Sequence, residues 1–424
     1  MKIAVVGSGI AGLTTAYYLT DHHEVTVFEK NDYIGGHTNT VKVDDKTGTV
    51  GVDTGFIVFN DRTYPRFKRL MTEVGVAWRD TEMSFSVQDP ETGLEYNGHT
   101  LLTLFAQKRN LFRPKFYRLL KGIVAFNEAA KKAAHENDDN DHITLGEFIE
   151  SLDLDEQVAD YYLLPMISAI WSSSIKDAYQ FPLGFFLRFF LNHGLLDITN
   201  RPQWHTIEGG SSAYIPKLTA KFSDRIRLSQ DITAVHRTEE GASLTFADGH
   251  TEAFDRVVFA CHSDQTLALL ADASDDEKQI LGSIPYKLNE VVLHTDRALL
   301  PLRKAAWASW NYRLRVGETA QREPSSVTYS MNILQGLKTH SHYLVTLNNS
   351  EAIDPDKVIK KLFYAHPQYS TTSMAARKDR DRINGVNNTY FCGAYWYSGF
   401  HEDGVHSAID VVNLIAPELE IDNG

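Results

Sequence analysis

The stretch that decides the fold lies near the start of the chain, where four apolar residues run into a glycine-rich turn. It reads Ile3-Ala4-Val5-Val6 and then Gly7-Ser8-Gly9-Ile10-Ala11-Gly12. The apolar run predicts a short buried strand, and the residues after the last glycine predict a helix. In this setting Gly7 allows a tight turn, Gly9 lets the backbone approach a diphosphate, and Gly12 lets the helix pack close to the strand. The pattern therefore predicts a nucleotide-binding turn.

A second apolar strand, Val25 to Phe28, ends in an acidic residue at the position where a nucleotide-binding unit needs one. Glu29 follows the first glycine by about 20 residues, where a carboxylate accepts hydrogen bonds from ribose hydroxyls and repels a 2′-phosphate. The start of the helix would stabilise the diphosphate with its free N–H groups and positive dipole. The cofactor contacts predicted in this part are Gly7, Ser8, Gly9, Ile10, Ala11, Gly12, Glu29 and Lys30.

Further glycines favour FAD over NAD. A second glycine pair, Gly35-Gly36, lets the backbone lie against another flat part of the cofactor, which a simple NAD unit does not need. Near the C-terminus, the loop from Ser398 to Ser407 opens a last helix, whose start would stabilise negative charge on a reduced flavin. The cofactor contacts predicted in these later parts are Gly35, Gly36, His37, Thr38, Gly55, Phe56, Ile57, Val58, Ile232, Gly393, Gly404 and Val405.

The composition excludes several classes of protein. The 424 residues carry a formal net charge of −13 and include two cysteines. This charge argues against a dedicated nucleic-acid binder, and two cysteines argue against a disulfide scaffold or a thiolate zinc cluster. No run of about 18 apolar residues predicts a spanning helix, and no acidic or histidine cluster has metal-ligand spacing. The chain starts without a signal-peptide pattern, so we expect a cytoplasmic protein, with peripheral attachment to the inner membrane as an open alternative.

Taken together, these motifs resemble the flavin-containing amine oxidase superfamily, which includes protoporphyrinogen oxidase and the carotenoid desaturases. The stretches Asp53-Thr54-Gly55, Glu208 to Pro216 and Phe391 to Gly404 extend the resemblance over nearly the whole chain. Strings such as Trp307 to Tyr312 are similar to a bacterial subfamily associated with cyclopropane-fatty-acid-synthase-like methyltransferases. Some of its members are thought to desaturate methyl-branched fatty acyl chains on the route to furan fatty acids.

The resemblance implies an α/β fold in which a Rossmann-type FAD-binding domain is discontinuous. Its pieces are expected at residues 1–80, 205–280 and 380–424. Residues 81–204 are expected to form a helical region that faces substrate or membrane, and residues 281–379 a substrate-binding sheet region.

Candidate catalytic residues lie near the C-terminus. His401 could accept a proton because imidazole titrates near neutral pH, although it could instead cap the helix or bond the flavin. Glu402 is a second candidate, or simply an acid in the first turn of a helix. Tyr395 could form an aromatic wall beside the flavin, or pack in the core. Members of the family commonly keep a lysine near the flavin, and the resemblance places Asn289 at about that position, which suits oxidation of C–H to C=C.

Two stretches bear on the substrate. Residues 107–122 carry cations but no acid, so they could dock on anionic lipid headgroups or form a solvated helix face. The cations are Lys108, Arg109, Arg113, Lys115, Arg118 and Lys121. The second stretch, residues 181–196, is apolar on most sides, which predicts burial in the core, a tunnel for a long apolar substrate, or contact with a membrane.

These observations lead to one hypothesis and three alternatives. We expect an FAD-dependent oxidoreductase that desaturates a long, lipid-like substrate, a methyl-branched fatty acyl chain of membrane phospholipid, with a methyltransferase as a possible partner. The alternatives are an oxidase of a small amine, an oxidase of a carotenoid or porphyrin, and a flavin-bound subunit that delivers lipid to a methyltransferase without redox turnover.

Overall fold

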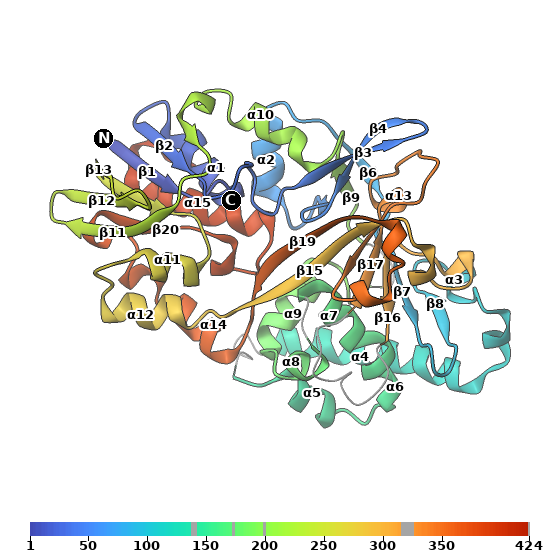
Figure 1. Ribbon diagram of the computed structural model, residues 1–424. Coiled ribbons are helices and arrows are strands. Elements are labelled where there is room, and N and C mark those ends of the chain that lie inside the picture. Colours follow the sequence, from blue (N-terminus) through green and yellow to red (C-terminus); the bar gives the residue numbers. More distant parts are fainter. Residues whose placement is uncertain (137–141, 172–173, 198–200, 315–325, 423–424) are drawn as a thin grey trace.

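A computed structural model describes residues 1–136, 142–171, 174–197, 201–314 and 326–422 (Figure 1). At one end of the molecule, a parallel sheet lies beside two helices that come from opposite ends of the chain. At the other end, a larger mixed sheet is packed against a group of helices (Figure 1).

The parallel sheet has five strands in the order β10-β2-β1-β14-β20. The strands are β1 (Lys2–Val6), β2 (Glu24–Phe28), β10 (Ile226–Arg227), β14 (Arg256–Phe259) and β20 (Thr389–Phe391). They come from three distant parts of the chain, and every pairing is parallel. Apart from Lys2, the residues of β1 are almost fully buried, as expected for a parallel strand covered on both faces. The mixed α/β architecture confirms the predicted fold class.

Helices α1 (Ile10–Leu19) and α15 (His401–Ile415) pack against each other on one face of this sheet. Their contact is close because Gly404 has no side chain: a Cβ there would lie 2.6 Å from Ile10 Cγ2. The opposite face is covered by an antiparallel sheet of β11 (Ile232–Thr238), β12 (Gly241–Phe246) and β13 (Thr251–Phe254). The N- and C-terminal segments therefore meet beside β1.

The larger sheet has seven strands in the order β19-β15-β18-β17-β16-β7-β8. These are β7 (Phe85–Gln88), β8 (Glu95–Asn97), β15 (Tyr286–His294), β16 (Trp310–Arg313), β17 (Ser326–Ser330), β18 (Leu344–Leu347) and β19 (Val358–Pro367). Only the β16–β7 pair is parallel. Small sheets β3–β4 (Thr40–Asp45 and Gly48–Asp53) and β5-β9-β6 (Phe59–Asn60, Trp204–Ile207 and Trp78–Thr81) complete the strands described.

The helices of the middle region surround a separate apolar core. They include α3 (Leu101–Leu104), α4 (Pro114–Glu136), α5 (Leu145–Ser151), α7 (Leu164–Trp171), α8 (Ile175–Tyr179) and α9 (Leu183–Asn192). The remaining longer helices are α2 (Pro65–Glu73), α11 (Ser263–Leu269), α12 (Asp275–Gly282) and α14 (Thr371–Lys378). In the described part of the chain, no helix is long and apolar enough to cross a membrane.

Two predictions for the middle region are corrected or decided by the structure. The region at 81–204 was expected to be helical, but it begins with β7 and β8, because Phe85 to Gln88 pairs with β16 of the large sheet. The apolar stretch at 181–196 contains the helix α9, which packs in the core with Phe186 and Phe190 fully buried. The residue limits proposed for the three domains stay a prediction.

Candidate functional site

The glycine-rich turn has the geometry that close packing requires. Gly7 has φ +110°, and its N–H donates to Phe28 O at 2.8 Å. A Cβ on Gly12 would lie 2.0 Å from Gly7 O, so α1 can approach the turn only because Gly12 has no side chain. By contrast, no atom lies within 4 Å of the position that a Cβ on Gly9 would take. The turn is thus packed on the side of α1 and open beside Gly9.

The start of α1 has no partner of its own. Gly9 is the N-cap, no side chain caps the helix, and the first turn holds no acidic residue. The first N–H groups of a helix have no acceptor inside the helix, and together with the dipole they favour an anion. This bare helix start fits the diphosphate of FAD.

The second glycine pair lies directly against this turn. Gly35 N–H donates to Ser8 O at 3.1 Å, and a Cβ on Gly36 would lie 3.4 Å from Gly9 Cα. Gly36 has φ +59°, a conformation that favours glycine. Gly7 and Gly35, the first residues of the two predicted glycine segments, are 28 residues apart in the sequence. The two segments nevertheless lie against each other and form one continuous backbone surface.

Glu29 lies beside the turn as predicted, but its hydrogen-bonding capacity is already used. Its Oε2 accepts from the N–H and hydroxyl of Ser8 at 2.9 and 2.7 Å, and its Oε1 accepts from the N–H and amide of Asn31 at 2.9 and 2.8 Å. A carboxylate offers about four lone-pair sites. Glu29 can therefore accept a hydrogen bond from a ribose hydroxyl only if the Ser8 hydroxyl or the Asn31 amide gives up its hydrogen bond to the carboxylate.

The segment around Gly55 is brought against the second glycine pair. Phe56 N–H donates to His37 O at 2.9 Å, and a Cβ on Gly55 would lie 2.1 Å from that same oxygen. The Phe56 ring stacks on the His401 ring with 3.6 Å between centroids. His401 Nε2 lies 2.8 Å from Thr38 Oγ1. Three segments predicted from separate motifs, those that contain Thr38, Phe56 and His401, thus converge at the start of α15.

The polar side chains at the start of α15 differ in what they contact. His401 is buried, and burial holds its pKa well below the usual value. Glu402 accepts from the N–H of Phe67 at 2.9 Å and forms an ion pair with Arg66 at 3.0 Å, so it caps the start of α2. Asp403 accepts from Phe400 N–H at 2.8 Å, and burial raises its pKa to about 7. A catalytic role for His401 or Glu402 stays a prediction.

The remaining residues predicted for the site lie in different surroundings. Tyr395 is buried, its hydroxyl has no hydrogen-bond partner, and burial raises its pKa well above the usual value. Gly393 donates its N–H to Ser407 Oγ at 2.9 Å. Lys30 is on the surface, where its exposed side chain pairs with Asp231 at 3.2 Å. The others are apolar side chains that pack in three separate cores: Val405, Ile232, and Ile57 with Val58.

Sequence reasoning missed a group of imidazoles beside the second glycine pair. The ring centroid of His37 lies 5.9 Å from that of His262 and 5.5 Å from that of His366. Asn289, which the resemblance places at or close to the position of the family's lysine, contacts His366 Nδ1 through its amide at 3.2 Å. Burial lowers the pKa of His37 and His262 to about 4 and that of His366 to about 3, so the group is uncharged at neutral pH. The three histidines are scattered in the sequence, so no local spacing could have revealed them.

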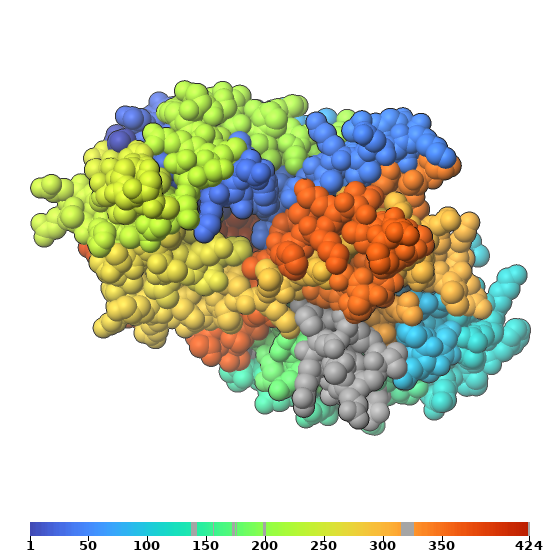
Figure 2. Space-filling view, viewed as in Figure 1, coloured from blue at the N-terminus to red at the C-terminus, as the bar shows by residue number. Residues whose placement is uncertain are grey.

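The structure fits FAD at these residues. The side chains of His37 and His262 each keep one buried ring nitrogen without a partner, and the α1 start is uncapped. Gly9, Gly36 and His37 are partly exposed, although each lies between packed elements. Figure 2 shows a recess where the blue N-terminal part meets the green and yellow parts of the chain. We therefore expect the Gly7–Gly12 turn and Gly35-Gly36 to hold the diphosphate part of the cofactor against the start of α1.

Comparison with known proteins defines the class. A family model described as flavin containing amine oxidoreductase matches residues 10–358, and the chain belongs to this family. Because the family contains flavin, FAD is the cofactor that membership implies.

Individual relatives are more distant. A Mycobacterium tuberculosis protein named "Putative flavin-containing monoamine oxidase AofH" is 25% identical over 271 residues, which cover 60% of this chain and 55% of that protein. The chain thus matches about half the length of this relative. The 4,4′-diapophytoene desaturase of Staphylococcus aureus is 48% identical over 52 residues, 12% of this chain and 10% of that protein.

Solved structures share the fold over nearly the whole chain. Cyclohexylamine oxidase from Brevibacterium oxydans has a TM-score of 0.70 at 15% identity, covering 99% of both chains. A fatty acid isomerase from P. acnes that produces CLA has a TM-score of 0.68 at 16% identity, covering 97% of both chains. At these identities the likeness shows the fold alone.

Proposed function

We propose that the protein is an FAD-dependent oxidoreductase that desaturates a long apolar substrate, a methyl-branched fatty acyl chain of membrane phospholipid. Family membership supports the flavin chemistry. The observation that carries the choice of substrate is an aromatic wall that leads from α9 to the start of α15. A match over 52 residues to a protein named as a desaturase favours the same type of reaction.

The aromatic wall is continuous. Phe400, the residue before His401, stacks on Phe189 of α9 with 5.1 Å between ring centroids. Phe189 in turn lies 4.6 Å from the ring of Trp171, and Phe185 stacks on Tyr369 at 4.7 Å. Phe185, Phe189, Trp171 and Tyr369 are buried and pack on one another, so a hydrocarbon chain would lie along this wall only where the rings move apart to admit it. Surroundings of this kind favour hydrocarbon by excluding water and offer little to a small polar amine.

Charged groups near the wall do not favour an ammonium. Glu402 is neutralised by Arg66, and the pKa of about 7 leaves Asp403 only partly ionised at neutral pH. Lys287 pairs with Asp177 at 3.2 Å, and the buried Asn289 is held by Asn348 at 2.8 Å. These contacts support oxidation of a C–H bond to C=C over amine oxidation.

Desaturation removes a hydride and a proton from adjacent carbons. When bound, FAD supplies the hydride acceptor. The chain itself must accept the proton, and the neutral imidazole of His401 is our candidate. Thr38 Oγ1 lies 2.8 Å from His401 Nε2 and 2.7 Å from the hydroxyl of Tyr214, so these two hydroxyls hold the imidazole ring in place.

The same proposal includes a methyltransferase as a partner. A methyl branch must be present before the branched chain is oxidised, so a methyl-transfer reaction has to supply the substrate. Direct association with that enzyme is testable by co-purification of the two tagged proteins.

The test is anaerobic reduction of the purified holoenzyme, followed by the visible flavin absorbance. We expect bleaching with methyl-branched phospholipid and none with a panel of small amines. Bleaching by amines alone would contradict the substrate, and no bleaching by any candidate would favour a non-redox role.

A histidine variant tests the proton acceptor. We expect His401→Ala to bleach much more slowly than wild type, by about 100-fold or more if general base catalysis is lost. The matched control is His236→Ala, an exposed histidine on β11, which should bleach at the wild-type rate. Equal rates for both variants would remove His401 from the mechanism.

A further inference from the structure

Large apolar side chains are exposed together at the part of the molecule that contains α3 and the start of α4. Leu101 and Leu102 of α3 are 78% and 87% exposed, and Phe112 is 86% exposed. Leu302 is 86% exposed and comes from a segment tied to β8, next to α3, because its N–H donates to Glu95 Oε1 at 2.8 Å. Most large apolar side chains in a folded protein are largely buried, so this cluster is unusual.

Cations surround these apolar side chains. Lys108, Lys115, Arg118 and Lys121 are exposed, and Arg113 is half-buried. Arg109 is exposed as well, but its guanidinium is used to hold the backbone oxygen of Gly93. No acidic residue occurs between Tyr96 and Asn127, and within the described ranges none of the six cations forms an ion pair. A local excess of positive charge therefore stands in a chain whose net charge is −13.

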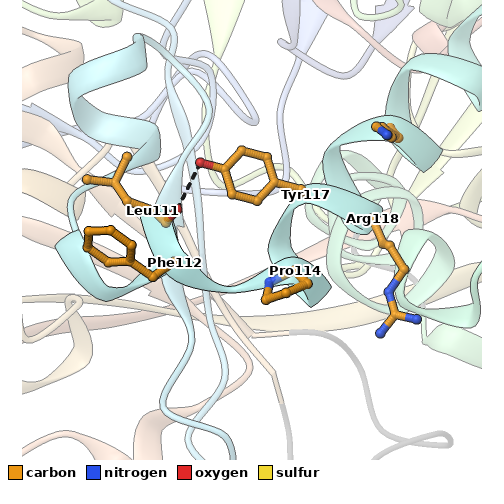
Figure 3. A pocket seen from close by; sticks show the side chains of 6 residues that line it. Leu111, Phe112, Pro114, Tyr117 and Arg118 are labelled. Atoms are coloured by element: carbon orange, nitrogen blue, oxygen red, sulfur yellow. Dashed lines mark hydrogen bonds between the residues drawn. The ribbon is translucent and has the colours of Figure 1, made fainter.

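The two kinds of side chain share one groove. Its volume is about 450 Å³, and it is lined by Leu111, Phe112, Pro114, Tyr117, Arg118 and Lys121. In the close view, Phe112 and Leu111 lie on one side and Arg118 on the other (Figure 3). The Tyr117 hydroxyl donates to Leu111 O at 3.0 Å, which fixes the 3₁₀ turn η1 (Lys108–Phe112) against α4 (Figure 3).

We propose that this surface docks the protein on an anionic phospholipid bilayer. We define the docking surface by its apolar residues Leu101, Leu102, Leu111, Phe112, Tyr117 and Leu302, and by its cations Lys108, Arg109, Arg113, Lys115, Arg118 and Lys121. The cations would lie among phosphate headgroups while the leucines and Phe112 enter the interface. Charge complementarity selects an anionic bilayer, because the same cations gain little from zwitterionic lipid.

Docking would bring the enzyme to a phospholipid substrate without a spanning helix. The inference therefore rests on the proposed function, but vesicle binding is measured without turnover, so the two can fail separately. A protein that binds anionic vesicles yet is not reduced by lipid would keep the docking surface and lose the substrate.

The experiment is co-sedimentation of the FAD-loaded full chain with vesicles of phosphatidylglycerol or phosphatidylcholine. We expect binding to phosphatidylglycerol that weakens as salt is raised, and little binding to phosphatidylcholine. The cation variant carries Lys108→Gln, Lys115→Gln, Arg118→Gln and Lys121→Gln, and it spares Arg109 because of its structural contact. Each basic residue contributes about fivefold near an anionic surface, so we expect at least about a 100-fold loss.

An apolar variant and a matched control separate lipid insertion from simple charge attraction. Leu102→Ser with Phe112→Ser should weaken binding by about tenfold or more, because both side chains lose their apolar contact with the interface. Leu288→Ser with Phe363→Ser removes two side chains that are 63% and 60% exposed on β15 and β19, and it should bind as wild type does. Unfolding curves confirm that each variant is folded.

Three results would overturn the proposal. Wild type could bind both kinds of vesicle equally or not at all. The cation variant could bind phosphatidylglycerol as tightly as wild type. Light scattering could show that wild type self-associates and that Leu102→Ser with Phe112→Ser makes it monomeric, which would assign the surface to a second copy of the chain.

Discussion

The starts of α1 and α15 lie close together, yet they differ in the charged side chains that they carry. The start of α1 has no side-chain cap and no acid in its first turn, whereas the first turn of α15 carries Glu402 and Asp403. Both acids are turned to the protein's own backbone, Glu402 to α2 and Asp403 to Phe400. A helix start left bare is available to an external anion, and one filled by its own carboxylates is much less so. The diphosphate of FAD is therefore expected at α1, and charge stabilisation of a reduced flavin by α15 is weaker than its position alone predicts.

The largest expected effect comes from adding a methyl group on the packed side of α1. In Gly12→Ala the Cβ would lie 2.0 Å from Gly7 O, so helix and turn must separate. We expect a loss of about 3 kcal/mol in the free energy of unfolding, measured with urea, together with loss of bound FAD. Normal stability would show that the helix does not need to approach the turn this closely.

The matched change on the open side is Gly9→Ala. Gly9 has φ −69°, which alanine adopts, and nothing lies within 4 Å of the new Cβ. Stability should change by less than about 1 kcal/mol, while FAD binding weakens by about tenfold or more because the methyl enters the space beside the diphosphate. Unchanged FAD retention, measured by absorbance after gel filtration, would place the cofactor elsewhere.

At α15, Glu402→Gln tests whether this acid serves the fold or the reaction. Removing the charge weakens the cap on α2 and removes the ion pair between Glu402 and the largely buried Arg66. We expect a loss of about 2 kcal/mol in unfolding free energy. The rate of flavin reduction by substrate should fall by less than a factor of about 3. A large fall in that rate at unchanged stability would instead support the catalytic prediction for Glu402.

Asp403 should make stability depend on pH. Burial raises its pKa to about 7 in the folded protein, above its unfolded value, so the folded state holds a proton that the unfolded state has lost. Its contribution to stability is therefore present at low pH and falls as pH rises from about 4 to about 7. Between pH 5 and pH 7, wild type should lose about 2 kcal/mol relative to Asp403→Asn in urea unfolding. A constant difference between the two proteins would show that the buried carboxyl titrates normally.

The smallest effect is expected at Lys30. This residue was predicted to contact the cofactor, but its exposed side chain pairs with Asp231 at the surface. Lys30→Ala should change the unfolding free energy by less than about 0.5 kcal/mol and leave FAD retention unchanged. Loss of FAD in this variant would show that the side chain turns inward when the cofactor binds.

The outcome of prediction differed between local and distant features. The turn from Gly7 to Gly12 could be predicted from the sequence, because each glycine is required by steric contacts within the strand, turn and helix that it joins. The strand at Phe85 to Gln88 was missed because it is short and its partner, β16, lies more than 200 residues away in sequence. Among the candidate site residues, the sequence grouped His401, Glu402 and Asp403, but it could not tell that two of them bond the protein's own backbone.

The sequence by itself determined the nucleotide-binding turn, the acid after the second strand, the second glycine pair and the family to which the chain belongs. Each of these features depends on residues that are close together along the chain. The residue types and their spacing are therefore enough to predict the function of each feature. Only the tertiary structure decided which acidic side chains cap helix starts. It also brought His37, His262 and His366 together beside the glycines. It also decided that Leu102 and Phe112 face outward while Phe116 and Leu119 face the core. Burial and neutralisation depend on what the rest of the chain packs against a residue, and no local pattern contains that information.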